Sequence, residues 1–485
     1  MVKTAREAGS SFNRRSLFKS YAAATADSPV RDALLAGSLY DLDKAAAATL
    51  LREQSPSLTL PLPDGGGGTL ELELVRVDIF APGFSVATSK PTDENVAEGL
   101  GVHYRGIVKG DERSLAAVSV YKNEVMGFYS TEAGGNSVLG RLGGTNPYDK
   151  HVLYAERDLM SSSTFSCDTA DGEAPEPAAS FQNPSEALAR CVRLYIEADH
   201  DLFQNKGSVA NTAGYLTGLF NQSAALYMNE GVPMSLSQIF VWNSPSPYTG
   251  TNSLQQLEQF SALRTSFNGD LAHLVSIQGF FGGVAYVPGL CNGGGRYAFS
   301  GIDPFFNDVP TYSWSVEVFT HETGHNMGSQ HTHSCVWNGN NTAIDGCAAP
   351  QGGCAQPDLP AGGGTIMSYC HQTSVGINFS LGFGPQPGGV ISNRFNNATC
   401  IAECGSGGGT PPNDNFASAQ VISGNTGAVV SSNANATKEP GEPSHGGNPG
   451  GASLWYSWQA PASGTATFTT TGSSFDTLLG VYTGG

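Results

Sequence analysis

Short runs of alternating apolar and polar residues dominate the first 160 or so positions of the chain. Residues 58–62 read LTLPL and residues 70–74 read LELEL, with the turn signal DGG at 64–66 between them. A period of two is typical of half-buried strands, and DGG is typical of the turn that joins them. We therefore predict a β-rich domain over residues 1–180 that carries no visible catalytic motif.

The β pattern ends at an acidic stretch. Residues 168–188 contain DTADGEAPEPAAS, with prolines and few large apolar side chains. This composition predicts an exposed linker that proteases can reach. We place a domain boundary there.

Strand and helix patterns then mix over residues 185–404. The stretch CVRLYIEAD at 191–199 alternates as a half-buried strand does, and apolar residues from Asn211 to Glu230 keep helical spacing up to the stop signal Gly231. This mixture predicts an α/β domain. Its other expected elements are strands at 234–242 and near 274 and 284, and a helix near 254–263.

The last part of the chain has a third character. The run GSGGGTPPN at 405–413 predicts a flexible linker. Residues 414–485 are rich in Thr, Ser and Gly, with strand patterns at 454–458 and 465–469. We expect a small accessory β-sandwich, cut short because the chain stops just after an apparent strand.

Charge and hydropathy exclude several classes of partner. The 485 residues include 24 Lys and Arg against 42 Asp and Glu, a formal net charge of -18. Such a charge disfavours nucleic acids and anionic membrane surfaces as partners. The sequence has no apolar run of the length that a membrane span needs, so we predict no membrane span.

The cysteines indicate an oxidising compartment. Six of the nine lie between positions 335 and 404, in a Gly- and Pro-rich stretch that disulfides could stabilise. A zinc site made only of cysteines would need paired C-x-x-C spacings, which the chain lacks. We expect a secreted protein, although basic residues at the N-terminus are not followed by the apolar run of a signal peptide.

The stretch HETGHNMGSQH at 321–331 carries the clearest chemistry. His321 and His325 are four residues apart, so they project from one face of a helix toward one metal ion. Gly328 permits a left-handed turn that would bring His331 to the same ion. Three histidines leave one zinc position open, as in catalytic sites. A chance match to these five positions is expected in roughly one random chain of this length in several thousand.

Glu322 follows the first histidine and is the candidate general base. Its carboxylate would take a proton from a zinc-activated water and later protonate the leaving amine, which is the hydrolysis of a peptide bond.

Two motifs in this order resemble the metzincin peptidases. HETGHNMGSQH is similar to their extended zinc signature, and GTIMSYC at 364–370 is similar to their Met-turn, with Met367 packed beneath the metal. The stretch GGVAYVPGLC at 282–291 resembles reprolysin or adamalysin-like secreted bacterial enzymes. Reprolysins usually have Asp where this chain has Thr332. The C-terminal module resembles sandwiches appended to bacterial peptidases.

The resemblance implies further roles. Tyr369, two residues after Met367, would stabilise the transition state as in serralysins and astacins, or would only pack. Glu197 would bind a structural calcium as in reprolysins. Cys291 would pair with a C-terminal cysteine such as Cys400. Substrate would bind in extended form along an edge strand near 283–286.

Cys167 is separated from the other cysteines and lies just before the predicted linker. A thiolate there could occupy the place of water at the zinc and keep the enzyme latent, as the cysteine switch of several metzincins does. The alternative is a disulfide with Cys191. The eight other cysteines admit 105 pairings, and we expect local bridges between His331 and Met367. We expect neither His333, which lies outside the metzincin spacing, nor His371 to be a ligand; His371 could form a substrate subsite or simply be solvated.

The sequence as a whole predicts a monomeric, secreted zinc endopeptidase made as a zymogen. Its fold would be an α/β (α+β) metzincin domain over 185–404, with a twisted mixed sheet and an active-site helix, between a β-rich prodomain (1–180) and a β-sandwich (414–485). Its substrates would be proteins or peptides. One rival is a surface-binding or adhesive protein with a vestigial zinc domain; another is a zinc hydrolase of nonpeptide substrates. The intact Glu322 argues against the first.

Overall fold

The computed structural model describes residues 1–23, 28–63, 68–143, 150–160, 167–169, 190–278, 281–302, 312–401, 411, 413–422, 428–431, 433, 436–445, 447–471, 473 and 477–483. The predicted turn at 64–66, most of the predicted linker at 168–188, Cys404 and most of the predicted linker at 405–413 lie outside these residues.

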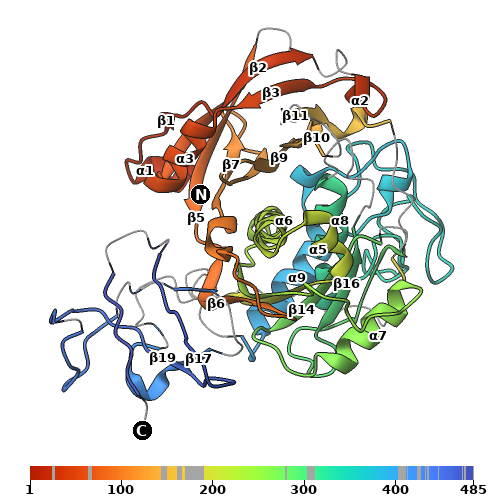
Figure 1. The fold of residues 1–485 in the computed structure, drawn as a ribbon. Coiled ribbons are helices and arrows are strands. Elements are labelled where there is room, and N and C mark those ends of the chain that lie inside the picture. Colours follow the sequence, from red (N-terminus) through yellow and green to blue (C-terminus); the bar gives the residue numbers. More distant parts are fainter. Residues whose placement is uncertain are drawn as a thin grey trace.

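The N-terminal region, residues 1–160, is built on a ten-stranded sheet (Figure 1). The predicted strands at 58–62 and 70–74 are confirmed, and they pair antiparallel with Leu60 opposite Leu72. The sheet order is β1-β4-β5-β7-β8-β9-β10-β11-β3-β2. Its strands are β1 (Asn13–Arg14), β2 (Phe18–Ala23), β3 (Ser38–Leu42), β4 (Ser57–Pro63), β5 (Thr69–Val77), β7 (Val102–Val108), β8 (Leu115–Val120), β9 (Val125–Thr131), β10 (Gly135–Arg141) and β11 (Lys150–Ala155); its helices are α1 (Val2–Glu7), α2 (Ser28–Arg31) and α3 (Lys44–Glu53).

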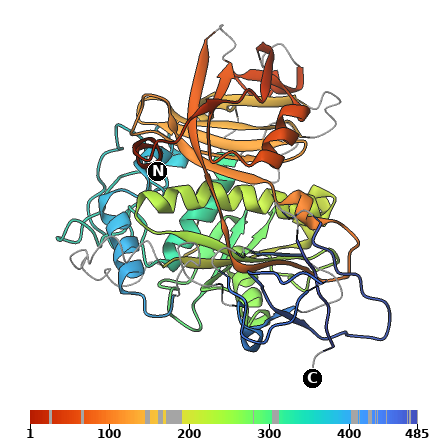
Figure 2. The ribbon, with the colours of Figure 1, turned by 90° about the vertical axis from the view of Figure 1, so that its left-hand side faces the viewer.

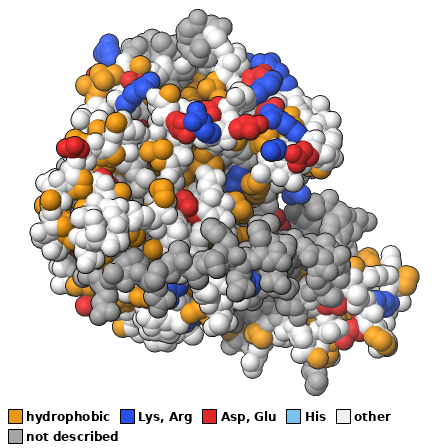
Figure 3. All heavy atoms as spheres, turned by 180° about the vertical axis from the view of Figure 1, so that it is seen from behind, with side chains coloured by type: hydrophobic (Ala, Val, Ile, Leu, Met, Phe, Trp, Pro, Cys, Tyr) orange, Lys and Arg blue, Asp and Glu red, His pale blue; other side chains and the backbone are white. Residues whose placement is uncertain are grey.

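One face of this sheet has a core of its own. Leu58, Leu60 and Leu72 are buried there with Leu50 of α3, whose N-terminus is capped by the Asp43 carboxylate. Charged side chains of both signs gather over the outer surface of the region, at the top of the rear view (Figure 3). They pair with one another, so this part of the surface is charged but mixed in sign.

The central region, residues 190–401, carries a seven-stranded mixed sheet in the order β15-β16-β14-β12-β13-β6-β18. Strands β16 to β6 run parallel, and the two edge strands β15 and β18 run antiparallel to their neighbours. The predicted strands and helices of this region are confirmed, whereas α5, β16 and α9 were not foreseen. The elements are β12 (Val192–Ala198), α5 (His200–Lys206), α6 (Val209–Asn229), β13 (Met234–Val241), α7 (Ser253–Leu263), β14 (Leu271–Ser276), β15 (Gly283–Ala285), β16 (Tyr297–Gly301), α8 (Tyr312–Asn326) and α9 (Pro385–Asn397).

One strand of this central sheet comes from the N-terminal region. Strand β6 (Phe80–Thr88) pairs parallel with β13, from Leu236 opposite Phe80 to Val241 opposite Thr88. A separate β-rich domain, as the sequence predicts for residues 1–180, would keep its strands in its own sheet. The two regions therefore share a sheet.

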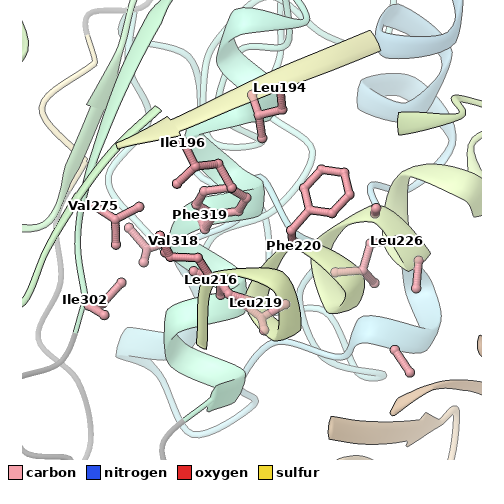
Figure 4. Packing of buried hydrophobic residues seen from close by; sticks show 14 of the residues in the cluster. Leu194, Ile196, Leu216, Leu219, Phe220, Leu226, Val275, Ile302, Val318 and Phe319 are labelled. Atoms are coloured by element: carbon pink, nitrogen blue, oxygen red, sulfur yellow. The ribbon is translucent and has the colours of Figure 1, made fainter. Parts of the chain in front are cut away.

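Helix α6 lies between the two sheets, as the side view shows (Figure 2). Leu216, Leu219 and Phe220 point toward β12 and α8, where they meet Ile196 and Phe319 (Figure 4). The opposite face of the helix packs on β8 and β9 of the N-terminal sheet. Because one apolar cluster runs from that sheet through α6 to the central sheet, α8 is held in a fully packed core.

Three disulfides fasten the part of the central region that follows α8. Cys291 bonds Cys400, as the resemblance implied. Cys335–Cys354 is a local bridge within the predicted stretch from His331 to Met367, whereas Cys347–Cys370 joins that stretch to a cysteine just after it. They fix a segment that has few regular elements, which is where covalent cross-links replace a core.

The C-terminal region contributes three short strands among its described residues. Strands β17 (Gln420–Ile422) and β19 (Tyr456–Trp458) pair with each other, and β18 (Ala428–Val430) pairs with β6. The β-sandwich stays a prediction. Among the described residues, no helix combines the length and the apolarity that crossing a bilayer requires.

Candidate active site

Helix α8 and the turn after it bring three imidazoles together. His321 and His325 are one helical turn apart, and Gly328 has a φ of +94°, the left-handed conformation expected of it. The chain then returns His331 to the same point. The Nε2 atom of His325 lies 3.2 Å from that of His321 and 3.1 Å from that of His331, and all three side chains are fully buried.

The second nitrogen of each ring sets its orientation. His321 Nδ1 is 2.8 Å from the Ile366 carbonyl oxygen, and His325 Nδ1 is 2.8 Å from the Ser329 carbonyl oxygen. Both oxygens are acceptors, so each Nδ1 carries the proton and each Nε2 lone pair faces the shared point. His331 Nδ1 is held in the same way, 3.2 Å from the Gln351 side-chain oxygen.

These donors fit a zinc ion. Tetrahedral zinc with Zn–N bonds of 2.0–2.1 Å separates its nitrogen ligands by about 3.3–3.4 Å, close to the distances found here. Burial and the neighbouring imidazoles hold the pKa values of His321 and His325 well below the ordinary value, so both rings are neutral, as metal ligands must be.

Glu322 lies beside the histidines in a dry environment. Its carboxylate is fully buried, and burial raises its pKa to about 8. Its Oε1 atom accepts no hydrogen bond from any described residue. Buried carboxylate oxygens are normally paired, so this oxygen is an exception to that rule.

Strand β15 packs directly against Glu322. A Cβ atom added to Gly283 would lie 2.6 Å from both Cγ and Cδ of Glu322, closer than side chains approach one another. Glycine is therefore required at this position if the carboxylate is to lie where it does. The sequence placed Gly283 on a substrate-binding edge but did not reveal this second role.

The predicted switch cysteine reaches the histidines. Cys167 Sγ is 3.5 Å from His325 Nε2 and 3.5 Å from Glu322 Oε2, and it belongs with His321, His325 and His331 to one buried cluster of possible metal ligands. Burial raises the pKa of the Cys167 thiol, and the charge of Glu322 raises it further. The alternative disulfide with Cys191 is wrong, because Cys191 lies against Ser235 on another strand.

The residues around this cysteine occupy the free edge of β15. The Asp168 N–H donates to the Gly283 carbonyl (3.0 Å), and the Ala285 N–H donates to the Thr169 hydroxyl (2.9 Å). The Thr169 hydroxyl also lies 3.3 Å from Glu322 Oε2. Segment 167–169 thus takes the hydrogen-bonding positions that the sequence predicted for an extended substrate.

The predicted Met-turn lies beneath the histidines. Met367 is fully buried, and its sulfur would lie 2.7 Å from a Cβ added to Gly324, on the helical turn between His321 and His325. The Tyr369 hydroxyl accepts from the Cys167 N–H (2.8 Å) and donates to the Cys167 carbonyl (2.9 Å). Tyr369 therefore contacts the backbone of the segment that covers the site.

Glu197 does not have the surroundings of a calcium ligand. It is fully buried, and four donors compensate its charge, including the guanidinium of Arg264 at 2.8 Å. Calcium needs six to eight oxygen ligands, whereas these neighbours are hydrogen-bond donors. The structure therefore does not support the implied calcium role. The other three donors are Tyr195 (2.5 Å), Trp242 (2.5 Å) and Tyr248 (2.6 Å).

His333 and His371 lie outside the ligand cluster, as predicted, but both side chains are buried rather than solvated. His333 stacks on His331, with ring centroids 4.9 Å apart. His371 Nδ1 lies 2.8 Å from a carboxylate oxygen of Glu317, which is one helical turn before His321. Neither belongs to the cluster of possible ligands among the described residues.

Sequence reasoning missed Gln351, Thr169 and Glu317. Each lies far in the sequence from the residue that it contacts. Gln351 orients His331 from 20 positions away, and Thr169 contacts the Glu322 carboxylate from 153 positions away. Gly283 had a weak signal, since a glycine inside a strand often marks a close approach of another group.

Comparisons with known proteins find a family model that matches part of the chain. The model of the family Reprolysin_5, described as metallo-peptidase family M12, matches residues 188–380. Among solved structures, the chain is similar to metalloproteinase-II from Bacteroides fragilis, with a TM-score of 0.32 and 11% identity over 63% of this chain and 88% of that chain. A chain of a chaperone-substrate complex has a TM-score of 0.24 and 13% identity over 30% of this chain and 25% of its own. No curated protein matches the chain.

Proposed function

Residues 188–380 form a reprolysin-like metallopeptidase domain, and on this premise we propose that the chain is a zinc-dependent endopeptidase of the metzincin type, made as a latent precursor. The observation that carries the proposal is the convergence of three buried imidazole Nε2 atoms near the buried carboxylate of Glu322, with Cys167 Sγ 3.5 Å from both His325 Nε2 and Glu322 Oε2.

The residues have distinct tasks in this reaction. His321, His325 and His331 would hold zinc, which supplies Lewis-acid chemistry by lowering the pKa of water and polarising the scissile carbonyl. Glu322 takes the proton of the attacking water and then donates it to the leaving amine. Once segment 167–169 has left, the Tyr369 hydroxyl is free to donate a hydrogen bond to the developing oxyanion.

The latency of the precursor is explained by segment 167–169, which covers the histidine site and the edge of β15. We call residues 1–169 the prodomain. Its thiol lies beside His325 and Glu322, and its backbone occupies the edge of β15, so water and an extended substrate are both kept out. Cutting the chain after this segment, in the predicted linker, would start activation. Three disulfides support secretion into an oxidising compartment.

The test compares wild-type protein with Glu322→Gln, both freed of the prodomain, on an unfolded protein substrate. Bound zinc is measured in both by mass spectrometry. Equal zinc with cleavage by the wild type alone supports the proposal, and the loss of a general base should lower the rate by about 10²–10⁴-fold. Zinc in both proteins with cleavage by neither favours the binding-protein alternative.

A further inference from the structure

Helix α7 covers the face of the edge strand β15 that points away from Glu322. Val284 of β15 packs with Leu257 and Phe260 of α7 in one apolar cluster. Gly283, the neighbouring residue of the strand, adjoins Glu322 on the opposite face. Successive side chains of a strand point to opposite faces of the sheet. A chain bound along this edge therefore presents alternate side chains to the histidine site and to α7.

The segment that covers the site shows this alternation in the precursor. The side chains of Cys167 and Thr169 both lie near Glu322 Oε2, at 3.5 Å and 3.3 Å. Asp168, between them, turns its carboxylate toward α7, where Oδ2 accepts a hydrogen bond from the Ser253 hydroxyl. The start of α7 therefore already binds a carboxylate, one residue away from the thiol that faces the histidines.

The first turn of α7 has the donors that a carboxylate needs. The Ser253 side chain is fully buried, so its hydroxyl is held in place. The Asn252 side chain caps this 11-residue helix by accepting from the Gln255 N–H (2.9 Å), which leaves the N–H groups of Ser253 and Leu254 without an acceptor among the described residues. Such N–H groups form the positive end of the helix dipole. Together with the hydroxyl they favour a negatively charged side chain.

A substrate can reach this site once the covering segment has left. Asp168 is exposed in the precursor and Ser253 beneath it is buried, so the site opens to solvent at the point that Asp168 fills. The backbone of the segment follows β15 here, with the Asp168 N–H donating to the Gly283 carbonyl (3.0 Å). An extended substrate that adds to the same strand edge places one of its side chains at the same point.

We propose that the peptidase prefers substrates with Asp or Glu within two residues of the scissile bond, and that Ser253 and the start of α7 form the subsite for this side chain. The proposal rests on the proposed function, because it names the substrate class of that site. Asp168 then takes the place of the substrate carboxylate in the precursor. An Asn in the substrate would keep the hydrogen bond but lose the charge, and hydrogen bonds to charged groups are about twice as strong.

The experiment uses the full chain, folded as the precursor and activated by cutting in the predicted linker until its activity stops rising. Cleavage sites in an unfolded protein are mapped by mass spectrometry and should be enriched in Asp or Glu at one position near the scissile bond. A peptide built on such a site is then compared with its counterpart that has Asn for Asp. We expect kcat/KM to be about tenfold higher for the Asp peptide. Ser253→Ala should lower kcat/KM for the Asp peptide alone, with unchanged zinc content.

Two variants control for changes unrelated to the carboxylate. Ser261→Ala makes the same change on the same helix, where the hydroxyl donates to the Glu258 carbonyl (3.1 Å), and it should keep the wild-type preference. Ser253→Thr retains a hydroxyl and should keep the preference as well.

The outcomes separate this proposal from the proposed function. Equal cleavage of the Asp and Asn peptides by the wild type would overturn the preference and leave the peptidase function standing, and this comparison needs no variant to fold. An unchanged preference in Ser253→Ala would overturn the subsite. If the activated wild type cleaves neither the peptides nor the unfolded protein, the peptidase function is overturned together with the preference that rests on it.

Discussion

Replacing Gly283 by alanine should disable Glu322 without touching the zinc site. The new Cβ would lie 2.6 Å from Cγ and Cδ of Glu322, whereas ordinary contacts between such atoms begin near 3.4 Å. The carboxylate must therefore move by about 1 Å. A misplacement of this size in catalytic geometry costs about 10²-fold in rate, or about 2.7 kcal/mol in activation free energy.

The assay is kcat/KM for a peptide substrate with protein freed of the prodomain. We expect about a hundredfold loss for Gly283→Ala, bounded below by the activity of Glu322→Gln. Zinc content should match the wild type, because the histidines are oriented by Ile366, Ser329 and Gln351, none of which lies on β15. Gly389→Ala controls for the general effect of a glycine-to-alanine change.

Two results would refute this reasoning. If Gly283→Ala kept its activity within threefold while Glu322→Gln lost its own, the edge strand would not position the carboxylate. If Gly283→Ala lost zinc and activity together, its effect would be disruption of the fold around α8. A shift of the carboxylate predicts neither of these.

Three further predictions concern Cys167, Tyr369 and Glu156. Uncut Cys167→Ala should cleave substrate at least tenfold faster than the inactive uncut wild type. If both uncut proteins are equally inactive, the thiol is not needed for latency. Tyr369→Phe, freed of the prodomain, should lose about 10–100-fold in kcat with unchanged zinc, and an unchanged kcat would leave the hydroxyl only its contact with segment 167–169. Burial beside Glu317 raises the pKa of Glu156 to about 7 from 4.5, so the folded precursor binds the proton more tightly than the unfolded chain and loses stability as pH rises between these values. Glu156→Gln should therefore gain thermal stability over the wild type at pH 8 but not at pH 4, by about 1–3 kcal/mol; an equal difference at both values would contradict the assignment.

The parts of the site that sequence predicted correctly are local in the chain. His321 and His325 share a helix face because of their spacing, and the φ of Gly328 follows from the absence of a side chain. The strand at 191–199 and the helix from Asn211 have apolar residues at the spacing of a strand and of a helix, and these residues are buried in the fold. Elements such as these need no knowledge of distant partners.

The parts that were missed depend on partners far away in the chain. Strand β6 looks like its neighbours in the N-terminal region, and only the pairing with β13, more than 150 residues later, assigns it to the other sheet. Glu197 has the sequence setting of a calcium ligand, but Arg264 arrives 67 residues later and neutralises it. The local sequence does not predict which cation will lie beside a buried carboxylate.

The prodomain joins the central sheet at two places, with segment 167–169 on the edge strand β15 and β6 between β13 and β18. The contact made by the described segment 167–169 is too small to keep an active site covered by itself, because its ordering cost exceeds what it gains. Attached to a folded body that is docked elsewhere, the same segment has a high effective concentration at the site. Latency then depends on β6 and α6 as well as on the thiol. For this reason the uncut Cys167→Ala variant should leak but stay well below the fully freed enzyme.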